Sequence, residues 1–409
     1  MVLLVLTLAC RPDGGASPSE TGRDTGIDTG APTAPTAVDV SPLSVAWRWS
    51  AGGLDADRLR RGFDWDLSWL GALPPPDGGH LVPIDDDGPT RVFQLDPAAL
   101  GLPDRALPAL TDALVELRQW SEWRGHVDLG RLLMRTLHEP WYYYAITGAC
   151  ADLDQWRQQR GSPEWDRYDV VVSQLASGGR VVWLPPAGTP VAELGFLVGT
   201  GTAPLGDGWQ AEEFETVDLM ANGQQRFAAW SADGRLEPAA NPEVVAAGTA
   251  GNCLWCHEDH LMTGTPDNPS TDTALSYEEW AARIDGWQAE LQAWRSSLQT
   301  SIDTTDHDVH ADGELVVREF LLPTVDRVAA EWGVDEEQAR SIIAERGLTL
   351  ETDAEWPGRG AVLRRSEVDA VLAERLGRAP PAVLDDARHL ADDEPLRGAE
   401  WAGFVDCSG

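Results

Sequence analysis

The order of apolar and polar positions predicts helices in the first part of the chain. Residues 104–124 and 128–146 carry apolar side chains at the three- and four-residue spacing of amphipathic helices. Pro140 lies within the second stretch and predicts a break there. Residues 151–168 predict a more polar helix. The tryptophan-rich residues 43–70 are expected to pack on the domain that follows them.

The pattern changes near residue 168 and predicts an antiparallel β-sheet up to residue 236. Short segments rich in β-branched and aromatic residues alternate here with turn sequences such as SGG, DG and NG. The segments are residues 168–175, 179–185, 192–201, 214–220 and 225–231.

Helical spacing returns in the last part of the chain. Between residues 277 and 299, five apolar side chains recur at steps of three and four: Trp280, Ile284, Trp287, Leu291 and Trp294. A polar loop rich in His and Asp is predicted over residues 300–314. Two helices are predicted within 314–349 and a last one at 362–377.

The net charge restricts the class of partner. The 409 residues include 67 acidic and 31 basic side chains, a formal charge of −36. This charge opposes nucleic-acid binding, in which basic patches supply most of the affinity. It also opposes docking on anionic lipid by charge alone. A protein partner with a basic docking face is compatible with it.

The N-terminus predicts export. Residues 1–10 read MVLLVLTLAC, an apolar stretch that ends at Cys10 and is similar to a bacterial lipoprotein signal, which implies lipidation of Cys10. Residues 11–42 are rich in Gly, Pro, Thr, Ser and Asp and predict a disordered tether. We expect a periplasmic or cell-surface protein held on a bacterial membrane by lipid only. An ordinary secretory signal is the alternative.

Residues 251–258, GNCLWCHE, contain the candidate chemistry. Cys253, Cys256 and His257 form a Cys-x-x-Cys-His motif, which provides two thiols for the vinyl groups of one haem and an imidazole for its iron. A zinc site that uses both cysteines and His260 is one alternative. A redox-active disulfide is a weaker one, because no βαβ unit precedes the motif.

Through these three residues the sequence resembles the c-type cytochromes, over residues 245–325. The resemblance implies one covalent haem c, with His257 as the proximal iron ligand, and single-electron exchange with a redox protein partner. In residues 128–148 and the letters CLWCHE, the chain also resembles a poorly characterised group of exported bacterial proteins. That second resemblance implies no particular activity.

The sixth iron ligand is the open question of this motif. Met262 lies only five residues after His257, and no methionine lies further downstream. His310 is the favoured ligand, because it follows the 277–299 helix and imidazole is an ordinary haem ligand. A solvated histidine in the polar loop is the alternative. Met134 and His138 are further candidates. An iron without a sixth ligand would instead suit a peroxidase-like enzyme or a gas sensor, although an electron carrier is favoured.

The two remaining cysteines are Cys150 and Cys407. In an oxidising compartment they could form a disulfide that closes most of the folded chain. Two unrelated buried thiols are the alternative.

Residues 308–319, DVHADGELVVRE, partly match a calcium-binding EF-hand loop. Asp308, Asp312, Gly313 and Glu319 occupy matching positions, but His310 stands where a carboxylate is expected. Calcium here would exclude His310 from the iron. An acidic loop that leads into a helix is the alternative, and a surface lipoprotein with structural calcium or zinc would then replace the haem protein.

Residues 324–373 resemble the winged helix-turn-helix of excisionase-type DNA binders. The charge of −36 opposes DNA binding, so we interpret this region as a helical packing module.

The predicted fold class is α+β and mostly helical, with an antiparallel β-sheet segment, a helical haem c module and a small C-terminal helical module. The predicted parts are a signal (1–10), a linker (11–42), a mainly helical region (43–167), a β region (168–240), a haem c module (241–325) and a C-terminal helical module (326–409).

Overall fold

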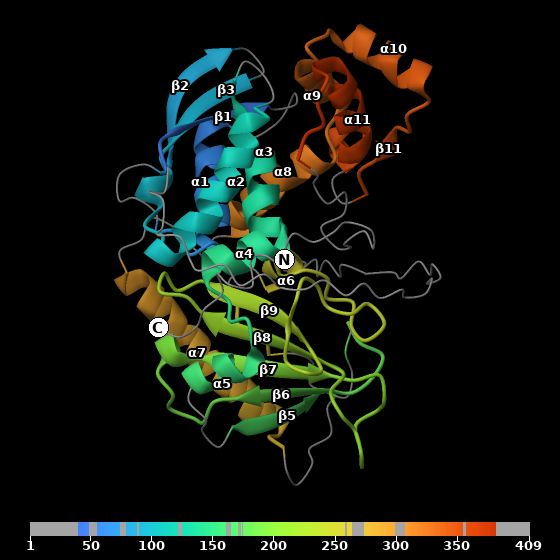
Figure 1. Ribbon diagram of the computed structural model, residues 1–409. Coiled ribbons are helices and arrows are strands. Elements are labelled where there is room, and N and C mark those ends of the chain that lie inside the picture. The colour runs from blue at the N-terminus through green and yellow to red at the C-terminus, as the bar shows by residue number, and fades with distance from the viewer. Residues whose placement is uncertain are drawn as a thin grey trace, which may run out of the picture. The chain divides into compact units, whose positions relative to one another are not determined.

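The computed structural model describes residues 40–381, with gaps at 49–54, 74–78, 88–89, 122–124, 161–164, 171–172, 174, 258–259, 264–273, 299–306 and 355–356. The predicted signal and nearly all of the predicted linker lie outside this range. The described residues confirm the α+β class, and those from residue 40 onward belong to one compact unit (Figure 1). None of the described helices is both long enough and apolar enough to cross a membrane.

A four-stranded sheet lies in the region predicted to be mainly helical, so that prediction is incomplete. The order of its strands is β2-β3-β1-β4. β3 pairs antiparallel with both β1 and β2, whereas β4 pairs parallel with β1. The strands are β1 (Leu43–Arg48), β2 (Leu81–Asp87), β3 (Thr90–Leu95) and β4 (Val127–Asp128).

Helices pack beside this sheet, and the predicted break at Pro140 is confirmed. Pro140 is the first residue of α4, and the Glu139 side chain caps that helix by accepting a hydrogen bond from the Tyr142 backbone N–H. The elements are α1 (Ala56–Ser68), α2 (Leu107–Gln119), α3 (Leu129–Leu133), the π-helical turn η3 (Met134–His138), α4 (Pro140–Thr147) and α5 (Leu153–Gln159), with 3₁₀ turns at Pro97–Leu100 and Asp104–Ala106.

The second sheet confirms the predicted antiparallel region. Its strands follow one another in sequence order, β5 to β10, and all pair antiparallel. Turn sequences between alternating apolar segments produce this simple order. The strands are β5 (Asp166–Val170), β6 (Arg180–Leu184), β7 (Gly195–Thr200), β8 (Glu213–Leu219), β9 (Gln225–Ser231) and β10 (Leu236–Glu237), with a 3₁₀ turn at Val191–Glu193.

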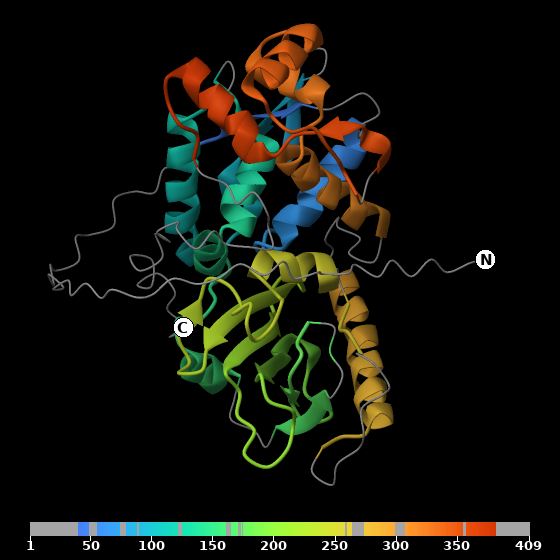
Figure 2. The same ribbon diagram turned by 90° about the vertical axis from the view of Figure 1, so that its right-hand side faces the viewer.

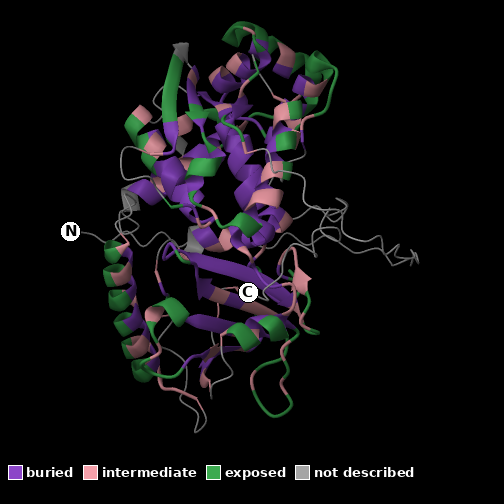
Figure 3. Ribbon diagram, turned by 60° about the vertical axis from the view of Figure 1, so that its left-hand side comes forward, coloured by how far each residue is buried: buried purple, intermediate pink, exposed green. Residues whose placement is uncertain are grey.

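The predicted amphipathic helix is α7 (Tyr277–Ser297), and it packs on the second sheet (Figure 2). Ser276 and Glu279 form a capping box at its start. The Trp280 ring stacks on Tyr168 of β5, with ring centres 4.7 Å apart. Figure 3 shows one buried and one exposed side along this helix, as its three- and four-residue spacing predicts.

The predicted polar loop is wrong over its second half, because α8 (His307–Leu321) begins inside it. α8 packs closely on α1 and α3. A Cβ atom on Gly62 of α1 would lie 2.7 Å from the Gly313 backbone nitrogen of α8. A Cβ on Gly130 of α3 would lie 2.2 Å from the Phe320 Cβ. Glycine at both positions therefore allows the helices to approach this closely.

The C-terminal helical module forms a second hydrophobic core. Val328 and Trp332 of α9 pack with Ile343, Val368 and other apolar side chains. Gly333 ends α9 in the left-handed region at φ 65°, as the predicted glycine turn requires. The elements are α9 (Val325–Trp332), α10 (Glu336–Arg346), α11 (Arg365–Leu376), a short pair of strands, β11 (Glu351–Thr352) and β12 (Ala361–Val362), and a 3₁₀ turn at Pro357–Arg359.

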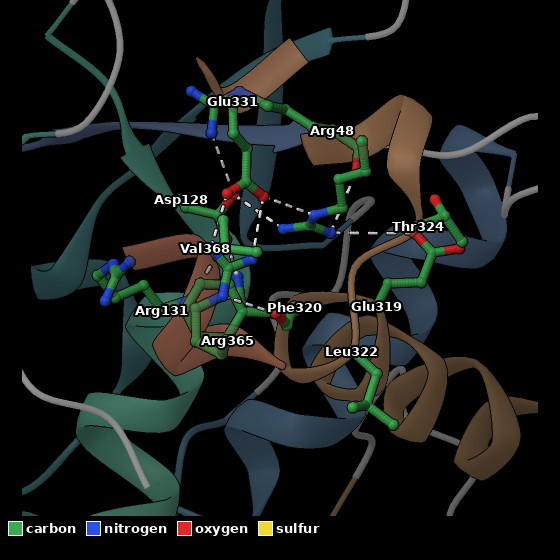
Figure 4. Close-up of polar contacts among 12 residues, drawn as sticks. Arg48, Asp128, Arg131, Glu319, Phe320, Leu322, Thr324, Glu331, Arg365 and Val368 are labelled. Atoms are coloured by element: carbon green, nitrogen blue, oxygen red, sulfur yellow. Dashed lines mark hydrogen bonds and ion pairs between the residues drawn. The ribbon is translucent and has the colours of Figure 1, made fainter. Parts of the chain in front are cut away.

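A buried ion network joins this module to the first sheet and to α3 and α8 (Figure 4). Arg327 of α9 contacts Asp128 at 3.0 Å and Glu331 at 2.9 Å. Arg365 of α11 holds both oxygens of Glu331, at 2.6 and 3.0 Å. We define the network as four arginines and four carboxylates: Arg48, Arg131, Arg327, Arg365, Asp128, Glu319, Glu331 and Asp369.

The charges of the network balance, which makes their burial tolerable. A buried ion is costly unless a partner of opposite charge and good hydrogen bonds compensate for the lost water. Burial opposes ionisation of Glu331, but Arg365 and Arg327 outweigh burial and hold the pKa of that carboxyl well below its ordinary value. The sequence offered no sign of this network, because only Arg327–Glu331 and Arg365–Asp369 have the local four-residue spacing and most other pairs join residues far apart in the chain.

Candidate functional site

The Cys-x-x-Cys-His motif lies on α6 (Ala250–His257), a helix that contacts β9, α4 and η3 (Figure 1). Leu254 is fully buried in the main core and fixes one side of this helix. Cys253 and His257 are four residues apart, so they lie on the same face of α6, one turn apart. Cys256 is adjacent to His257 on the same helix.

Cys253 packs against the main core, near two buried tyrosines of α4. Its thiol donates a weak hydrogen bond to the Thr249 carbonyl, with sulfur and oxygen 3.8 Å apart. Burial raises the pKa of both Tyr143 and Tyr144, and the nearby Cys253 raises both values further. Cys253 thus faces the aromatic interior between α6 and α4. The side chains of Trp255 and Cys256 lie outside the described residues.

The His257 ring packs against Phe227 of β9, with ring centres 5.0 Å apart and planes tilted by 49°. Its Nδ1 atom is buried and has no hydrogen-bond partner within the described part of the chain. Burial lowers the pKa of His257 to about 4, a backbone hydrogen bond with His260 acts in the opposite direction, and Arg180 lowers it further. The imidazole is therefore neutral at pH 7, with a lone pair available to a metal.

Arg180, whose charge acts on His257, is the first residue of β6 and pairs with an acidic cluster on β8. Arg180 forms an ion pair with Glu215 at 2.5 Å. Burial raises the pKa of the neighbouring Glu213 to about 8, although a hydrogen bond from the Asn241 backbone N–H acts in the opposite direction. Sequence reasoning missed Arg180, Phe227 and the two tyrosines around the motif, because nothing in their local pattern separates them from ordinary sheet and core residues.

The described residues of the motif fit a covalently held haem. Cys253 and His257 share one helix face, the imidazole is neutral, and its buried Nδ1 lacks a protein partner. Haem c takes two thiols and a neutral imidazole, of which Cys253 supplies one thiol and His257 the imidazole. Haem bound here would supply reversible one-electron chemistry, while α6, β9 and α4 would hold its ligand and exclude water.

The structure brings η3 to α6, and with it two candidates for the far side of the iron. A Cβ atom on Gly251 would lie 2.7 Å from the His138 Nδ1 atom. His138 is fully buried, and Met134 on the same turn is nearly so. Single π-helical turns are frequent at functional sites. Met262, by contrast, is 52% exposed.

His310, the favoured sixth ligand, is not brought to α6. It lies on α8, where its ring contacts the edge of Trp65 with ring centres 4.6 Å apart. Two further rings, Trp69 and Phe227, lie between Trp65 and His257. This placement does not support His310 as a ligand of an iron held by His257.

The calcium hypothesis does not fit the backbone. An EF-hand loop wraps around its ion, whereas residues 307–321 form one continuous helix. Asp312 forms an ion pair with Arg58, and Glu319 lies in the buried network near Arg327. Among the described residues, no group of three or more His, Cys, Asp or Glu side chains is arranged to hold a metal ion. The zinc alternative also needs Cys256, whose side chain lies outside the described residues, so it stays a prediction.

The structure describes only one of the three remaining cysteines. Cys150 is fully buried, three residues after the end of α4. Cys407 and Cys10 lie outside the described residues. The Cys150–Cys407 disulfide and the lipidation of Cys10 therefore stay predictions.

Comparison with protein families, with curated proteins and with solved structures finds no match to this chain. The assignment of the site therefore rests on the motif and on the geometry around α6.

The buried side chain of His138 should make the free energy of unfolding sensitive to acid. Burial lowers the pKa of His138 to about 4. In the unfolded chain it takes up a proton near pH 6.5, while in the folded chain it stays neutral down to about pH 4. As the pH falls through this window, we expect His138 to remove about 3 kcal/mol from the free energy of unfolding. Urea unfolding of the haem-free protein at both ends of the window measures this loss.

The matched variant is His138→Gln, which keeps a polar side chain without this titration. Its free energy of unfolding should fall less steeply over the same window. Equal slopes for the variant and the natural protein would contradict the prediction.

Proposed function

We propose that this chain is an exported, lipid-anchored c-type haem protein that transfers single electrons through one covalently bound haem c. The observation that carries the proposal is the arrangement on α6, where Cys253 and a neutral, half-buried His257 lie one turn apart against β9 and α4. Cys253 and Cys256 are the thioether anchors, and His257 is the proximal iron ligand.

The charge of the chain supports a basic redox partner. A formal charge of −36 attracts a protein with a basic docking face and accelerates its approach at low salt. Lipid at Cys10 and the linker of residues 11–42 would hold the folded part at a periplasmic or outer surface. Nucleic acid is not a partner in this proposal, because the same charge repels it.

An optical spectrum tests the proposal directly. The protein is made in a host with cytochrome c maturation, and its spectrum is taken before and after reduction with dithionite. The denatured protein is then stained for haem. We expect covalent haem with sharp reduced bands. Stoichiometric zinc without haem, or neither cofactor, would contradict the assignment.

An open iron site is a second candidate, favoured by the placement of His310 away from α6. In that case the protein would be a peroxidase-like enzyme or a gas sensor. Carbon monoxide separates the two functions. A reduced spectrum that does not change with carbon monoxide indicates a six-coordinate electron carrier, with Met134 or His138 as the next ligand to replace. A shifted Soret band indicates the open site.

A further inference from the structure

A continuous line of buried aromatic rings runs from His257 to His310. The ring centres of His257 and Phe227 are 5.0 Å apart, and those of Phe227 and Trp69 are 6.0 Å apart. Trp69 and Trp65 follow at 5.4 Å, and Trp65 and His310 at 4.6 Å. Each contact is within the usual range of packed aromatic pairs. The line crosses from β9 to α1 and then to α8.

All the inner rings of this line are shielded from water. Trp69 is fully buried, Trp65 is 1% exposed and Phe227 is 3% exposed. The Trp69 indole nitrogen has no hydrogen-bond partner among the described residues, so its ring stands in an apolar setting. Packing alone would explain buried tryptophans, but it does not require them to join the candidate iron ligand to another helix.

The rate of electron tunnelling falls exponentially with distance, and it falls less steeply through groups that are in close contact. A chain of contacting π-systems therefore couples two sites better than the same distance through aliphatic side chains. The outer end of the line lies near the surface. Arg58, whose side chain is 49% exposed, pairs there with Asp312 on the α8 turn that follows His310. Arg61, also exposed, lies one turn before Trp65 on α1.

We propose that Phe227, Trp69 and Trp65 form the electron path between haem held at His257 and a one-electron partner at the α1–α8 surface. The inference rests on the proposed function. In each transfer the iron is oxidised from ferrous to ferric and the partner takes up that electron. No ring is chemically changed, and no proton moves. His310 is then the outer end of the path and not an iron ligand.

A photochemical rate measurement tests the path. A ruthenium polypyridyl label is attached through the thiol introduced by Arg61→Cys, in haem-loaded full-length protein that also carries Cys10→Ser. Peptide masses establish that the label is on position 61. A flash with an external quencher produces Ru(III), which takes an electron from the ferrous haem. Transient absorption follows the oxidation of the haem. Haem content and reduction potential are measured first for every variant.

The decisive comparison is between two buried tryptophans of the same core. Trp69→Leu should slow haem oxidation several-fold, whereas Trp47→Leu should leave the rate unchanged, since Trp47 is equally buried but outside the line. Trp69→Phe keeps an aromatic ring and should retain most of the rate. Comparison of this variant with Trp69→Leu separates the loss of the aromatic ring from a general destabilisation of the core. Equal rates in Trp69→Leu and Trp47→Leu would overturn the proposal.

A second aromatic route gives a further discriminating variant. Trp141 contacts Tyr144 with ring centres 5.9 Å apart, and Tyr144 lies near Cys253. If Trp141→Leu slowed the transfer and Trp69→Leu did not, the path would run through α4 and the proposal would be wrong.

A haem-free variant separates failure of the path from failure of the proposed function. If the haem measurement finds no haem, the proposed function fails at that step. The ring contacts are then tested in the ruthenium-labelled Cys253→Ser/Cys256→Ser protein. Its fold is checked by circular dichroism. Ru(III) there takes one electron from a tryptophan, which becomes a radical cation while the label returns to Ru(II). The radical absorption should fall in Trp65→Leu and not in Trp47→Leu. Equal radical signals would overturn the coupling through Trp65.

Discussion

Replacing Glu331 with glutamine is expected to lower the free energy of unfolding by about 3–5 kcal/mol, since removing one partner of a buried ion pair leaves an uncompensated charge. Glu331 lies between Arg327 and Arg365 and accepts hydrogen bonds from both. Glutamine keeps the shape but loses the charge that both guanidinium groups require. Urea unfolding at neutral pH, with circular dichroism as the probe, measures the difference.

Glu336→Gln is the matched control. Glu336 pairs with Arg340 four residues later on α10, and both side chains are more than half exposed. Exposed pairs contribute about 0–1 kcal/mol, so this variant should unfold close to the natural protein. Because the pKa of Glu331 is held well below its ordinary value, its contribution persists as the pH falls through that ordinary value and is lost only in stronger acid. Similar losses in both variants would show that the network does not stabilise the fold.

The second large effect concerns the cofactor. Replacing Cys253 and Cys256 together with serine should abolish covalent haem, because the hydroxyl of serine does not form the thioether bonds that attach the porphyrin. We expect no haem-stained band after denaturation and no sharp reduced bands in the visible spectrum. Each single variant should keep at most one bond and a red-shifted reduced spectrum.

Cys150→Ser is the control for a general effect of losing thiols. Cys150 is buried but lies outside α6, so haem staining should persist in this variant. Its thermal stability should fall if the predicted bond to Cys407 exists, and the loss should vanish under reducing conditions. Haem staining that survives the double replacement on α6 would disprove the proposed attachment.

Local patterns predicted the elements whose contacts are also local. The β5–β10 sheet was predictable because each strand pairs with its sequence neighbour across a turn. The β2–β3 pairing is also local, but it was missed because Pro83 and the acidic residues 85–87 interrupt the apolar pattern of β2. β4 was missed because it pairs with the distant β1, with Val45 opposite Val127, and no local signal reports a pairing across that separation. A single two-residue strand such as β4 also has too little pattern to recognise.

α8 shows how tertiary packing overrides a polar sequence. The letters HDVHADGE favour a loop, yet the segment is helical and buries Val309, Val316 and Phe320. Glycine at position 313 weakens an isolated helix. Here a Cβ atom at this position would lie 2.5 Å from the Asp66 Oδ1 atom of α1, so glycine permits the close approach of α8 to α1. The motif residues of the site were predictable from their spacing, whereas the aromatic surroundings of His257 depend on the fold.

The buried ion network also fixes the order in which the chain can finish folding during synthesis. Asp128 needs Arg327, which follows it by 199 positions, and Arg131 needs Asp369, which follows by 238. Until α9 and α11 have left the ribosome, the first half would have to bury Arg131 without Asp369 and Asp128 with Arg48 alone, at a cost that opposes its closure. A chain that completes its core only when its last quarter is made stays unfolded for longer, which would suit the proposed export.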